Sequence, residues 1–309
     1  MEAIDLSKNY DSFTALSDLN LRIEGSKCVG FLGPNGAGKT TTLKIFTDLI
    51  RPSSGEALIN GLNVQTRKKD ALASVSTLIE TPEIYPSLTP KEALLMIAEI
   101  RGIPRSERSK RVEEVVAEVR MEEWLDKRVG KFSKGMKQRI CIASALLSDP
   151  TVILLDEPTS GLDPRGMSEV RGIVKSLKNK KRLVFMSSHI LSEVSEVCDE
   201  VAMIDHGKLL VYDTISNLTS GSRTENVVEV SLLRPVDEGV VSKSIAALPG
   251  IVGTERINDR KLRIKFDGGL DAQEQILLDL VKMDIGVISY SPVSSALEDV
   301  YLKLTKIAL

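Results

Sequence analysis

The feature that most constrains this chain is a glycine-rich loop, Gly33–Thr40, which reads GPNGAGKT. It follows the short apolar run Lys27–Leu32 and precedes Thr40–Leu49, a segment whose pattern predicts a helix. Glycines let successive backbone N–H groups curl around phosphate oxygens without a Cβ in the way. The N-terminus of the following helix also favours anions. The loop therefore predicts a phosphate-binding α/β unit, in which a strand leads through the loop into a helix.

The loop also matches the pattern G-x-x-x-x-G-K-S/T, whose last residues have defined parts in nucleotide binding. Lys39 can reach the β- and γ-phosphates, and the Thr40 hydroxyl can ligate Mg²⁺. A glycine turn that merely opens an ordinary helix is the alternative, but the strand before the loop and the helix after it argue against that interpretation. The predicted nucleotide-binding residues of this segment are Gly33, Pro34, Asn35, Gly36, Ala37, Gly38, Lys39, Thr40 and Thr41.

A second chemical group is the acidic pair Asp156-Glu157, which ends the apolar run Val152–Leu155. The run predicts a buried parallel strand, and the carboxyl end of such a strand is where α/β sheets bind ligands. We expect Asp156 to hold Mg²⁺ through water, and Glu157 to act as a general base or to orient the attacking water. An acidic cap at a strand end is common alone. Together with the loop, the pair predicts nucleoside triphosphate hydrolysis.

Further motifs, in chain order, resemble those of the nucleotide-binding subunits of ABC transporters. Phe132–Arg139, FSKGMKQR, resembles the family signature LSGGQ-x-Q-R and stands shortly before the acidic pair. Ser160–Asp163 resembles the D-loop that follows these acids, and His189 resembles the switch histidine. Tyr10 stands where the family places an aromatic side chain that stacks on adenine. The resemblance covers residues 1 to about 215.

The resemblance implies that two such modules pack head to tail, with each ATP between the loop of one and the signature of the other. Ser133, Gly135 and the N-terminus of their helix would donate to the γ-phosphate. Asp163 would couple the two sites across the dimer. The implied ligands are ATP and Mg²⁺, and the implied catalytic residues are Lys39, Glu157 and His189.

The sequence departs from the commonest family pattern in the signature and in the Q-loop. Lys134 and Met136 replace a glycine and a glutamine of the signature, and Glu80 stands where the family usually has the Q-loop glutamine. A carboxylate can still bind Mg²⁺ or water, so Glu80 joins Thr40 and Asp156 as a predicted metal-site residue. It cannot donate a hydrogen bond unless it is protonated. Three nearby residues are predicted either to receive the membrane partner or to pack in the core, namely Ile84, Tyr85 and Leu88.

The order of the predicted elements gives an α/β fold with a P-loop NTPase core. Residues 1 to about 60 are β-rich and predict an antiparallel subdomain, and a helical subdomain is predicted over about 88–145. Helices then alternate with buried strands, which predicts a mainly parallel sheet. A linker predicted over Ser216–Glu225 separates an ATPase domain, 1–219, from an accessory domain, 220–309. The latter has the order β-α-β-β-α-β of a small ferredoxin-like α+β domain, closed by a helix over Ser295–Lys306.

Composition narrows the possible functions. The formal net charge of the 309 residues is -2, so no general basic excess attracts nucleic acid, and none is predicted as a partner. The three cysteines, Cys28, Cys141 and Cys198, are far apart and predict buried, inert thiols. No run approaches the ~18 apolar residues of a membrane span, and no signal peptide is predicted. A transport role therefore requires a separate membrane protein.

The favoured function is that of an export ATPase at the cytoplasmic face of the cell membrane, which energises a separate multi-spanning permease. The second ATPase subunit of the dimer is identical or different, and the cargo is a drug, peptide or lipid-like molecule. The ending Leu297–Leu302, LEDVYL, resembles that of drug- and antibiotic-export ATPases that pair with ABC-2-type permeases. The tail carries no acid, base or nucleophile grouping that predicts catalysis.

Three alternatives remain at this stage. An importer ATPase subunit has the same chemistry. A soluble ABC ATPase acting on DNA or ribosomes belongs to another class, but only about ninety residues separate Thr40 from Phe132, too few for the long coiled coil of the DNA-repair relatives. A catalytically inactive subunit is disfavoured because Lys39, Glu157 and His189 are all present.

Overall fold

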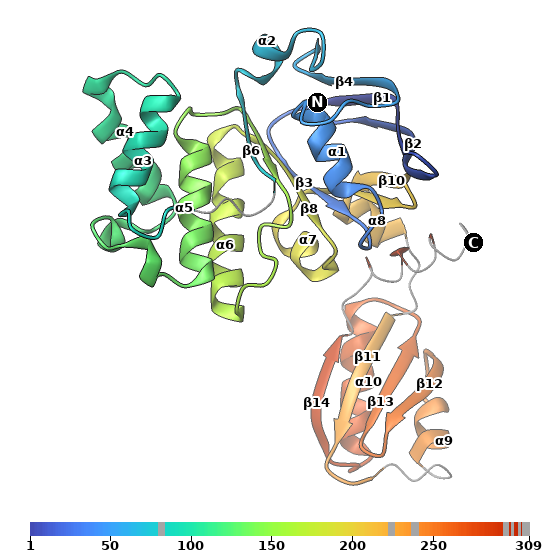
Figure 1. Cartoon of the computed structure of the whole chain (residues 1–309). Helices are drawn as coiled ribbons and strands as arrows, with labels where there is room; N and C mark the ends of the chain where they lie inside the picture. Colours follow the sequence, from blue (N-terminus) through green and yellow to red (C-terminus); the bar gives the residue numbers. More distant parts are fainter. Residues whose placement is uncertain are drawn as a thin grey trace. The chain divides into compact units, whose positions relative to one another are not determined.

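The computed structural model describes residues 1–79, 84–221, 226–235 and 241–292, together with 297, 300, 301 and 304. The chain forms two compact units, Met1–Asn217 and Leu218–Lys306, each with its own hydrophobic core (Figure 1). Within these described residues, no helix is both long enough and apolar enough to cross a membrane.

The first unit is built on a six-stranded sheet with the order β10-β9-β3-β8-β7-β6. All neighbours from β9 to β6 run parallel, and β10 adds an antiparallel edge. Every residue of β3, β7 and β8 is buried, as expected for parallel strands covered on both faces. This confirms the predicted parallel sheet. Its strands are β3 (Cys28–Leu32), β6 (Val75–Leu78), β7 (Val152–Leu155), β8 (Leu183–Ser188), β9 (Glu200–Asp205) and β10 (Lys208–Thr214).

A four-stranded antiparallel sheet, in the order β2-β1-β4-β5, forms a second layer. Its buried residues share one core with the parallel sheet and with α1 (Lys39–Phe46). In that core the Phe31 and Phe185 rings, from β3 and β8, have centroids 5.1 Å apart. The loop after β3 therefore starts from a rigid support. The strands are β1 (Glu2–Tyr10), β2 (Phe13–Arg22), β4 (Ser54–Ile59) and β5 (Leu62–Asn63).

Two-residue turns close two of the hairpins in this unit. Asn60-Gly61 joins β4 to β5, and His206-Gly207 joins β9 to β10. The φ angles are 51° and 74° in the first turn and 47° and 77° in the second. Positive φ at both central positions belongs to the type I′ turn, which matches the twist of the flanking strands. His206 is thus a turn residue.

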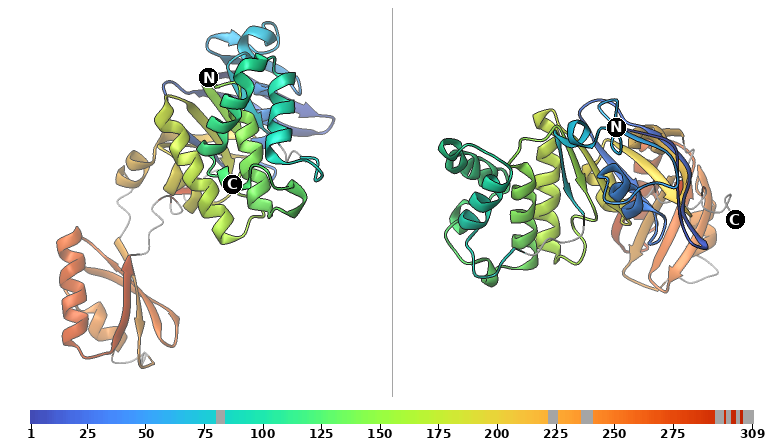
Figure 2. Two further views of the ribbon diagram at one scale, coloured as in Figure 1. Left: turned by 90° about the vertical axis from the view of Figure 1, so that its left-hand side faces the viewer. Right: turned by 45° about the horizontal axis from the view of Figure 1, so that its top comes forward.

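Four helices form the helical subdomain, and both Figure 1 and Figure 2 show α3 and α4 beside α5 and α6. The first of them starts with a capping box, in which Thr89 and Glu92 each accept a hydrogen bond from the other's backbone N–H. The Trp124 ring meets the Phe132 ring edge-on, with centroids 5.8 Å apart, just before α5. The four helices are α3 (Pro90–Ile100), α4 (Arg105–Glu118), α5 (Lys134–Leu146) and α6 (Pro164–Leu177). The shorter helices of the unit are α2 (Lys68–Leu72), α7 (Leu191–Val197) and the 3₁₀ turns Glu122–Trp124, Val129–Lys131 and Lys178–Lys180.

An ion-pair network centred on a buried arginine joins α4 to the start of β8. The Arg182 side chain, 4% exposed, donates to Glu118 at 2.8 Å and to Asp149 at 2.7 Å. Burial would raise the pKa of the Glu118 carboxyl, but hydrogen bonds from Arg182 and Lys180 outweigh it and lower that pKa. The hydrogen bond from Arg182 also lowers the pKa of Asp149. The helical subdomain is thus tied to the sheet by groups that stay ionised at neutral pH.

All three cysteines are buried, and none of them forms a disulfide among the described residues. Burial raises the pKa of the Cys141 thiol to about 11. The sulfur atoms of Cys28 and Cys198 lie 3.6 Å apart, and this hydrogen bond together with burial raises the pKa of Cys198 well above its usual value. Because the thiolate is the reactive form, thiols of raised pKa are poor nucleophiles and poor metal ligands.

The second unit is a four-stranded antiparallel sheet, in the order β12-β13-β11-β14, with two helices. Its element order is β-α-β-β-α-β, which confirms the predicted ferredoxin-like arrangement. The buried side chains of the two central strands pack with Ile276 and Leu280 of the second helix. The elements are β11 (Asn226–Leu232), α9 (Val241–Ala246), β12 (Ile251–Asn258), β13 (Lys261–Phe266), α10 (Leu270–Lys282) and β14 (Val287–Pro292).

The linker predicted over Ser216–Glu225 contains the boundary between the two units, which falls between Asn217 and Leu218, but its first part is helical and belongs to α8 (Ile215–Gly221). Thr214 caps this helix by accepting from the Asn217 N–H at 3.1 Å, and the Asn217 side chain donates to Asp213 at 2.8 Å. Ser, Thr and Asn are typical both of linkers and of helix caps, so composition alone did not separate the two. The rest of the predicted linker lies outside the described residues.

The closing helix predicted over Ser295–Lys306 is described at four positions, all of them helical: Leu297, Val300, Tyr301 and Leu304. Their spacing of three, one and three residues places them on one face of a helix. The other residues of this prediction lie outside the described part of the chain.

Candidate nucleotide-binding site

The glycine-rich loop lies at the carboxyl end of β3 and is fixed at both of its ends. The Gly33 N–H donates to the Ser188 carbonyl at 3.3 Å, and the Ala37 carbonyl accepts from the Gly207 N–H at 3.1 Å. Gly38, directly before α1, has a φ of 104°, and a Cβ there would lie 2.6 Å from the Ala15 carbonyl oxygen. Only glycine fits this position, because any other side chain would clash with the Ala15 carbonyl and would strain the backbone. The exposed part of the loop is Pro34, Asn35 and Gly36.

Lys39 lies inside the curve of the loop, with a side chain that is only 5% exposed. Its ammonium donates to the carbonyls of Gly33 at 2.7 Å and Pro34 at 3.0 Å. The same nitrogen is 3.5 Å from the Glu157 carboxylate. A cation so held stands beside the backbone N–H groups at the start of α1, which have no partner within the helix. The combination suits an anionic polyphosphate.

Asp156 and Thr40 meet across two elements, as predicted for a shared metal site. The Thr40 hydroxyl donates to one Asp156 oxygen at 2.8 Å. The other Asp156 oxygen accepts from the Ser187 hydroxyl of β8 at 2.5 Å, and the same hydroxyl accepts from the Glu157 N–H at 2.9 Å. Ser187 therefore orients both acids, and nothing in the sequence interpretation assigned it that part. Its place one residue before the end of β8, the strand next to β7, is what could have revealed it.

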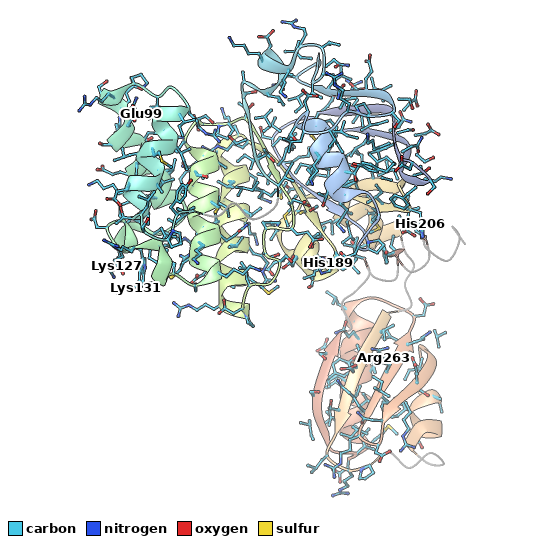
Figure 3. All side chains as sticks on the ribbon, in the orientation of Figure 1. Glu99, Lys127, Lys131, His189, His206 and Arg263 are labelled. Atoms are coloured by element: carbon cyan, nitrogen blue, oxygen red, sulfur yellow. The ribbon has the colours of Figure 1, made fainter. Side chains whose placement is uncertain are left out.

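Glu157 is shared between two basic side chains. Its Oε1 lies 3.1 Å from His189 Nδ1 and 3.5 Å from Lys39 Nζ. His189 follows β8 directly, is 40% exposed, and is marked in Figure 3. Glu157 has a φ of 42°, a left-handed conformation that is uncommon for a residue with a side chain. Such backbone conformations concentrate at functional sites, where surrounding contacts hold them.

The donors at this point suit Mg²⁺, which prefers oxygen ligands and is bound by one or two protein groups together with substrate phosphates. The Thr40 hydroxyl and the Asp156 carboxylate are such donors, already in contact. Among the described residues no group of three or more His, Cys, Asp or Glu side chains could hold a metal ion alone. The donor set thus fits an ion that binds together with a nucleotide. Glu80, the other predicted metal-site residue, lies outside the described residues.

The signature segment opens helix α5. The exposed Ser133 is its N-cap, and its hydroxyl accepts from the Met136 N–H at 3.2 Å. The buried Gly135 lies against α6, where a Cβ would come within 3.1 Å of the Gly166 Cα. Close helix packing therefore requires this glycine, whatever else it contacts. The Lys134 ammonium donates to the Ser160 carbonyl at 3.2 Å, which ties the signature to the loop after the acids.

Two further predicted site residues lie at exposed positions. Tyr10 ends β1 with 44% of its surface exposed, and the Lys8 ammonium lies 4.8 Å from its ring centroid. Asp163 precedes α6 at the N-cap position without a side-chain capping bond. Among the described residues, no hydrogen bond or ion pair joins Tyr10, Ser133, Gly135 or Asp163 to the group around Glu157. The structure brings together Lys39, Thr40, Asp156, Glu157 and His189, and leaves these other four apart.

Comparison with known proteins shows which family the chain resembles. The family model described as ABC transporter matches residues 16–160. The bacitracin transport ATP-binding protein BcrA of Bacillus licheniformis is 43% identical over 211 residues, 68% of this chain and 68% of its own length. The chain belongs to the ABC transporter ATP-binding proteins. The chain is therefore an ABC ATPase, an enzyme that binds and hydrolyses ATP.

Two further similarities bear on the extent of the match. The uncharacterized ABC transporter ATP-binding protein YhcH of Bacillus subtilis (strain 168) is 32% identical over 99% of this chain and 95% of its own. A solved structure of the ATP-binding subunit of an ABC transporter superimposes on this chain with a TM-score of 0.62 at 30% identity. The match covers 71% of this chain and 92% of the chain in the solved structure. The predicted P-loop NTPase fold is confirmed.

The Q-loop neighbours have mixed exposure in this ABC ATPase. Tyr85 is 67% exposed, whereas Ile84 and Leu88 are partly buried. The Leu88 N–H donates to the Tyr85 carbonyl at 3.0 Å, so the segment forms a turn. The turn presents the tyrosine ring outward. Tyr85 is thus accessible to a partner, whereas Ile84 and Leu88 are only partly accessible, and the choice between partner docking and core packing stays a prediction for all three.

Proposed function

We propose that this ABC ATPase energises a separate multi-spanning permease, for export, from the cytoplasmic face of the cell membrane. The observation that carries the proposal is the Glu157 carboxylate held between Lys39 and His189 at the end of the glycine-rich loop. A nucleotide-driven chain without a membrane-spanning helix among its described residues needs a membrane partner in order to move a cargo. The net charge of -2 offers no general attraction for nucleic acid.

The chemistry follows from the residues around Glu157. The loop N–H groups and Lys39 bind the β- and γ-phosphates, and Glu157 orients a water and accepts its proton as the water attacks the γ-phosphorus. His189 contacts the γ-phosphate and keeps the Glu157 carboxylate in place. Mg²⁺ bound by Thr40 and Asp156 would neutralise charge on the phosphates. Hydrolysis thus rests on positioned side chains and needs no covalent intermediate.

The complete site is proposed to form between two chains packed head to tail. The exposed Ser133, Gly135 and the N-terminus of α5 would complete the phosphate site of a second ATPase subunit, identical or different. Tyr10 would stack on adenine, and Asp163 would couple the two sites. The separation of these residues from the Glu157 group supports this arrangement, because no hydrogen bond or ion pair among the described residues joins the start of α5 to that group.

The proposed cargo is a drug, peptide or lipid-like molecule. The name of the Bacillus licheniformis relative connects that protein to bacitracin transport, and the identity of 43% supports a related cargo here. The LEDVYL ending supports the same class. An importer subunit and a soluble ABC ATPase that acts on a macromolecular complex are the alternatives that the experiment below separates from export.

The test is capture of the membrane partner by a hydrolysis-deficient chain. Glu157→Gln protein is incubated with ATP and Mg²⁺ and used to pull down proteins from detergent-solubilised membranes of its own cells. Lys39→Ala protein, which should not bind ATP, serves as the matched control. A multi-spanning permease enriched with the first variant over the second is expected. Recovery of an importer permease together with a solute-binding protein would contradict export and indicate import. Recovery of ribosomes or nucleic acid without a membrane protein would overturn the transport role.

A further inference from the structure

A buried carboxylate outside the nucleotide group joins two segments of the site. Glu193, 1% exposed, is the third residue of α7. Its Oε2 accepts hydrogen bonds from the Thr159 hydroxyl at 2.8 Å and from the Ser188 hydroxyl at 3.1 Å. Its Oε1 has no hydrogen-bond partner among the described residues.

Helix capping does not account for this carboxylate. A glutamate at the third position of a helix commonly turns back to accept from the N–H of the N-cap residue. Here the N-cap is Ile190, and its N–H donates to the Ser188 hydroxyl at 2.9 Å. Glu193 is therefore released from the helix end and points into the protein.

Packing alone does not account for it either. A buried carboxylate with an unpaired oxygen is destabilising compared with an apolar side chain of similar volume. Unsatisfied buried groups in native proteins call for a specific explanation. The partners of Glu193 supply one, because both belong to segments that carry groups of the nucleotide site.

The first partner lies in the turn that follows Glu157. The Ser160 N–H donates to the Glu157 carbonyl at 3.0 Å, which closes a turn around Thr159. This turn holds the positive φ of Glu157. The second partner, Ser188, stands directly before His189 in the chain. The Oε2 atom of Glu193 thus binds both the turn that follows Glu157 in the sequence and the residue that precedes His189.

We propose that Glu193 is a positioning residue for ATP hydrolysis. By binding both Thr159 and Ser188, it fixes the distance between the segment that follows Glu157 and the segment that precedes His189, and so maintains the contact between these two side chains. The inference rests on the proposed roles of Glu157 and His189. It predicts that the geometry of the acceptor oxygen matters and that its negative charge does not. A glutamine at this position keeps a carbonyl oxygen that can accept both hydroxyl hydrogens.

The test compares Glu193→Ala, Glu193→Gln and, as a matched control, Glu196→Ala in the full chain with ATP and Mg²⁺. Glu196 lies on the same helix with 52% of its side chain exposed. We expect kcat to fall about tenfold or more in Glu193→Ala, the effect of losing positioned hydrogen bonds at a buried site. The KM for ATP should stay within about twofold, because the loop and Lys39 are not touched. Glu193→Gln and Glu196→Ala should retain most of the wild-type kcat.

A double variant separates positioning from a general loss of structure. If Glu193 acts through His189, Glu193→Ala should slow His189→Ala no further, whereas independent structural damage would multiply the two losses. A kcat of Glu193→Ala within about twofold of wild type would overturn the proposal. So would equal losses in the Ala and Gln variants, or multiplied losses in the double variant. If His189→Ala itself has wild-type turnover, the assignment of the site fails, and this inference fails with it.

Discussion

The group around Glu157 and the signature segment Phe132–Arg139 are organised in opposite ways. In the first, two acids, a lysine, a threonine and a histidine are linked by contacts of 2.8 to 3.5 Å. In the second, the Ser133 hydroxyl accepts from the Met136 N–H of its own helix, and Gly135 packs on Gly166. Among the described residues, no hydrogen bond or ion pair links this segment to the acids, the lysine, the threonine or the histidine of the first region.

Under the proposed head-to-tail packing, the two regions are the unlike halves of one site, each contributed by a different chain. The Glu157 group can hold a triphosphate on one side only, because the N-terminus of α5 belongs to a different part of the unit. Among the described residues, the signature reaches the loop after the acids through the Lys134 hydrogen bond to the Ser160 carbonyl. This hydrogen bond runs to the D-loop and not to the phosphate-binding loop. It therefore adds no phosphate-binding group to the site around Glu157.

The largest predicted effect is on turnover. Glu157→Gln keeps the shape of the side chain but removes its basicity, so we expect kcat to fall about 10²–10⁴-fold, the usual contribution of a general base. ATP binding should remain, since the Lys39 contacts with the loop carbonyls are intact. Steady-state phosphate release and nucleotide binding measure the two effects, with Glu196→Gln on the surface of α7 as the control. Turnover at the wild-type rate would remove Glu157 from the mechanism.

The next largest effect is on stability and concerns the ion pairs of Arg182, which lie outside both the Glu157 group and the signature segment. A change there should affect folding and leave turnover unaffected. Arg182→Met should lower the free energy of unfolding by about 3 kcal/mol, the loss expected when one partner of a buried ion pair is removed. The kcat should change little. Arg165→Met is the control, since the Arg165 side chain is 86% exposed and a surface pair contributes at most about 1 kcal/mol. Denaturant unfolding measures both variants, and equal losses in the two would contradict this account.

The same network has a defined pH dependence. The pKa values of Glu118 and Asp149 are lowered in the folded protein, so their stabilisation is present above the unfolded-state values near pH 4. It disappears as the pH falls through the lower folded-state values. The difference in unfolding free energy between wild type and Arg182→Met should therefore shrink below about pH 4. A difference that does not change with pH would point to packing and not to charge.

The smallest predicted effect lies within the Glu157 group. Ser187→Ala removes the hydroxyl that donates to Asp156 and accepts from the Glu157 N–H. A lost hydrogen bond to a buried group amounts to about 1–3 kcal/mol, so a kcat reduction of about tenfold is expected. Ser195→Ala, at an exposed position of α7, is the control. Equal turnover in the two serine variants would show that the acids hold their own orientation.

Local patterns in the sequence were enough to predict much of the fold. The strands β3, β7 and β8 are recognisable from their short apolar runs, because parallel strands are buried on both faces. The ferredoxin-like order of the second unit followed from spacing alone. Strand β6 was not predicted, since Val75–Leu78 contains Ser and Thr and becomes a strand only by pairing with β7. Residues 1–60 could be predicted only as β-rich, without the bounds of β2, because β-bulges in its pairing with β1 disturb the alternation.

The site residues also divide into those that local sequence patterns could predict and those that depend on contacts far apart in the chain. Gly33–Thr40, Asp156 and Glu157 are adjacent in sequence to the elements that place them, so their grouping could be predicted. Ser187 and Glu193 act through contacts 31 and 34 residues away in the chain, with Asp156 and Thr159. No local pattern carries that information. Similarly, nothing near Lys134 in the sequence predicts its contact with Ser160.

The central claim, that the signature of one chain completes the phosphate site of another, is tested most directly by placing a charge at Ser133. Asn and Asp cap helices about as well as Ser, so both variants should preserve the start of α5. Asp alone places a negative charge where the γ-phosphate bound to the other subunit would lie. In the Glu157→Gln background, with ATP and Mg²⁺, light scattering should find dimers of the parent and of Ser133→Asn, but monomers of Ser133→Asp. An ATP-dependent Ser133→Asp dimer as stable as the parent would contradict the account.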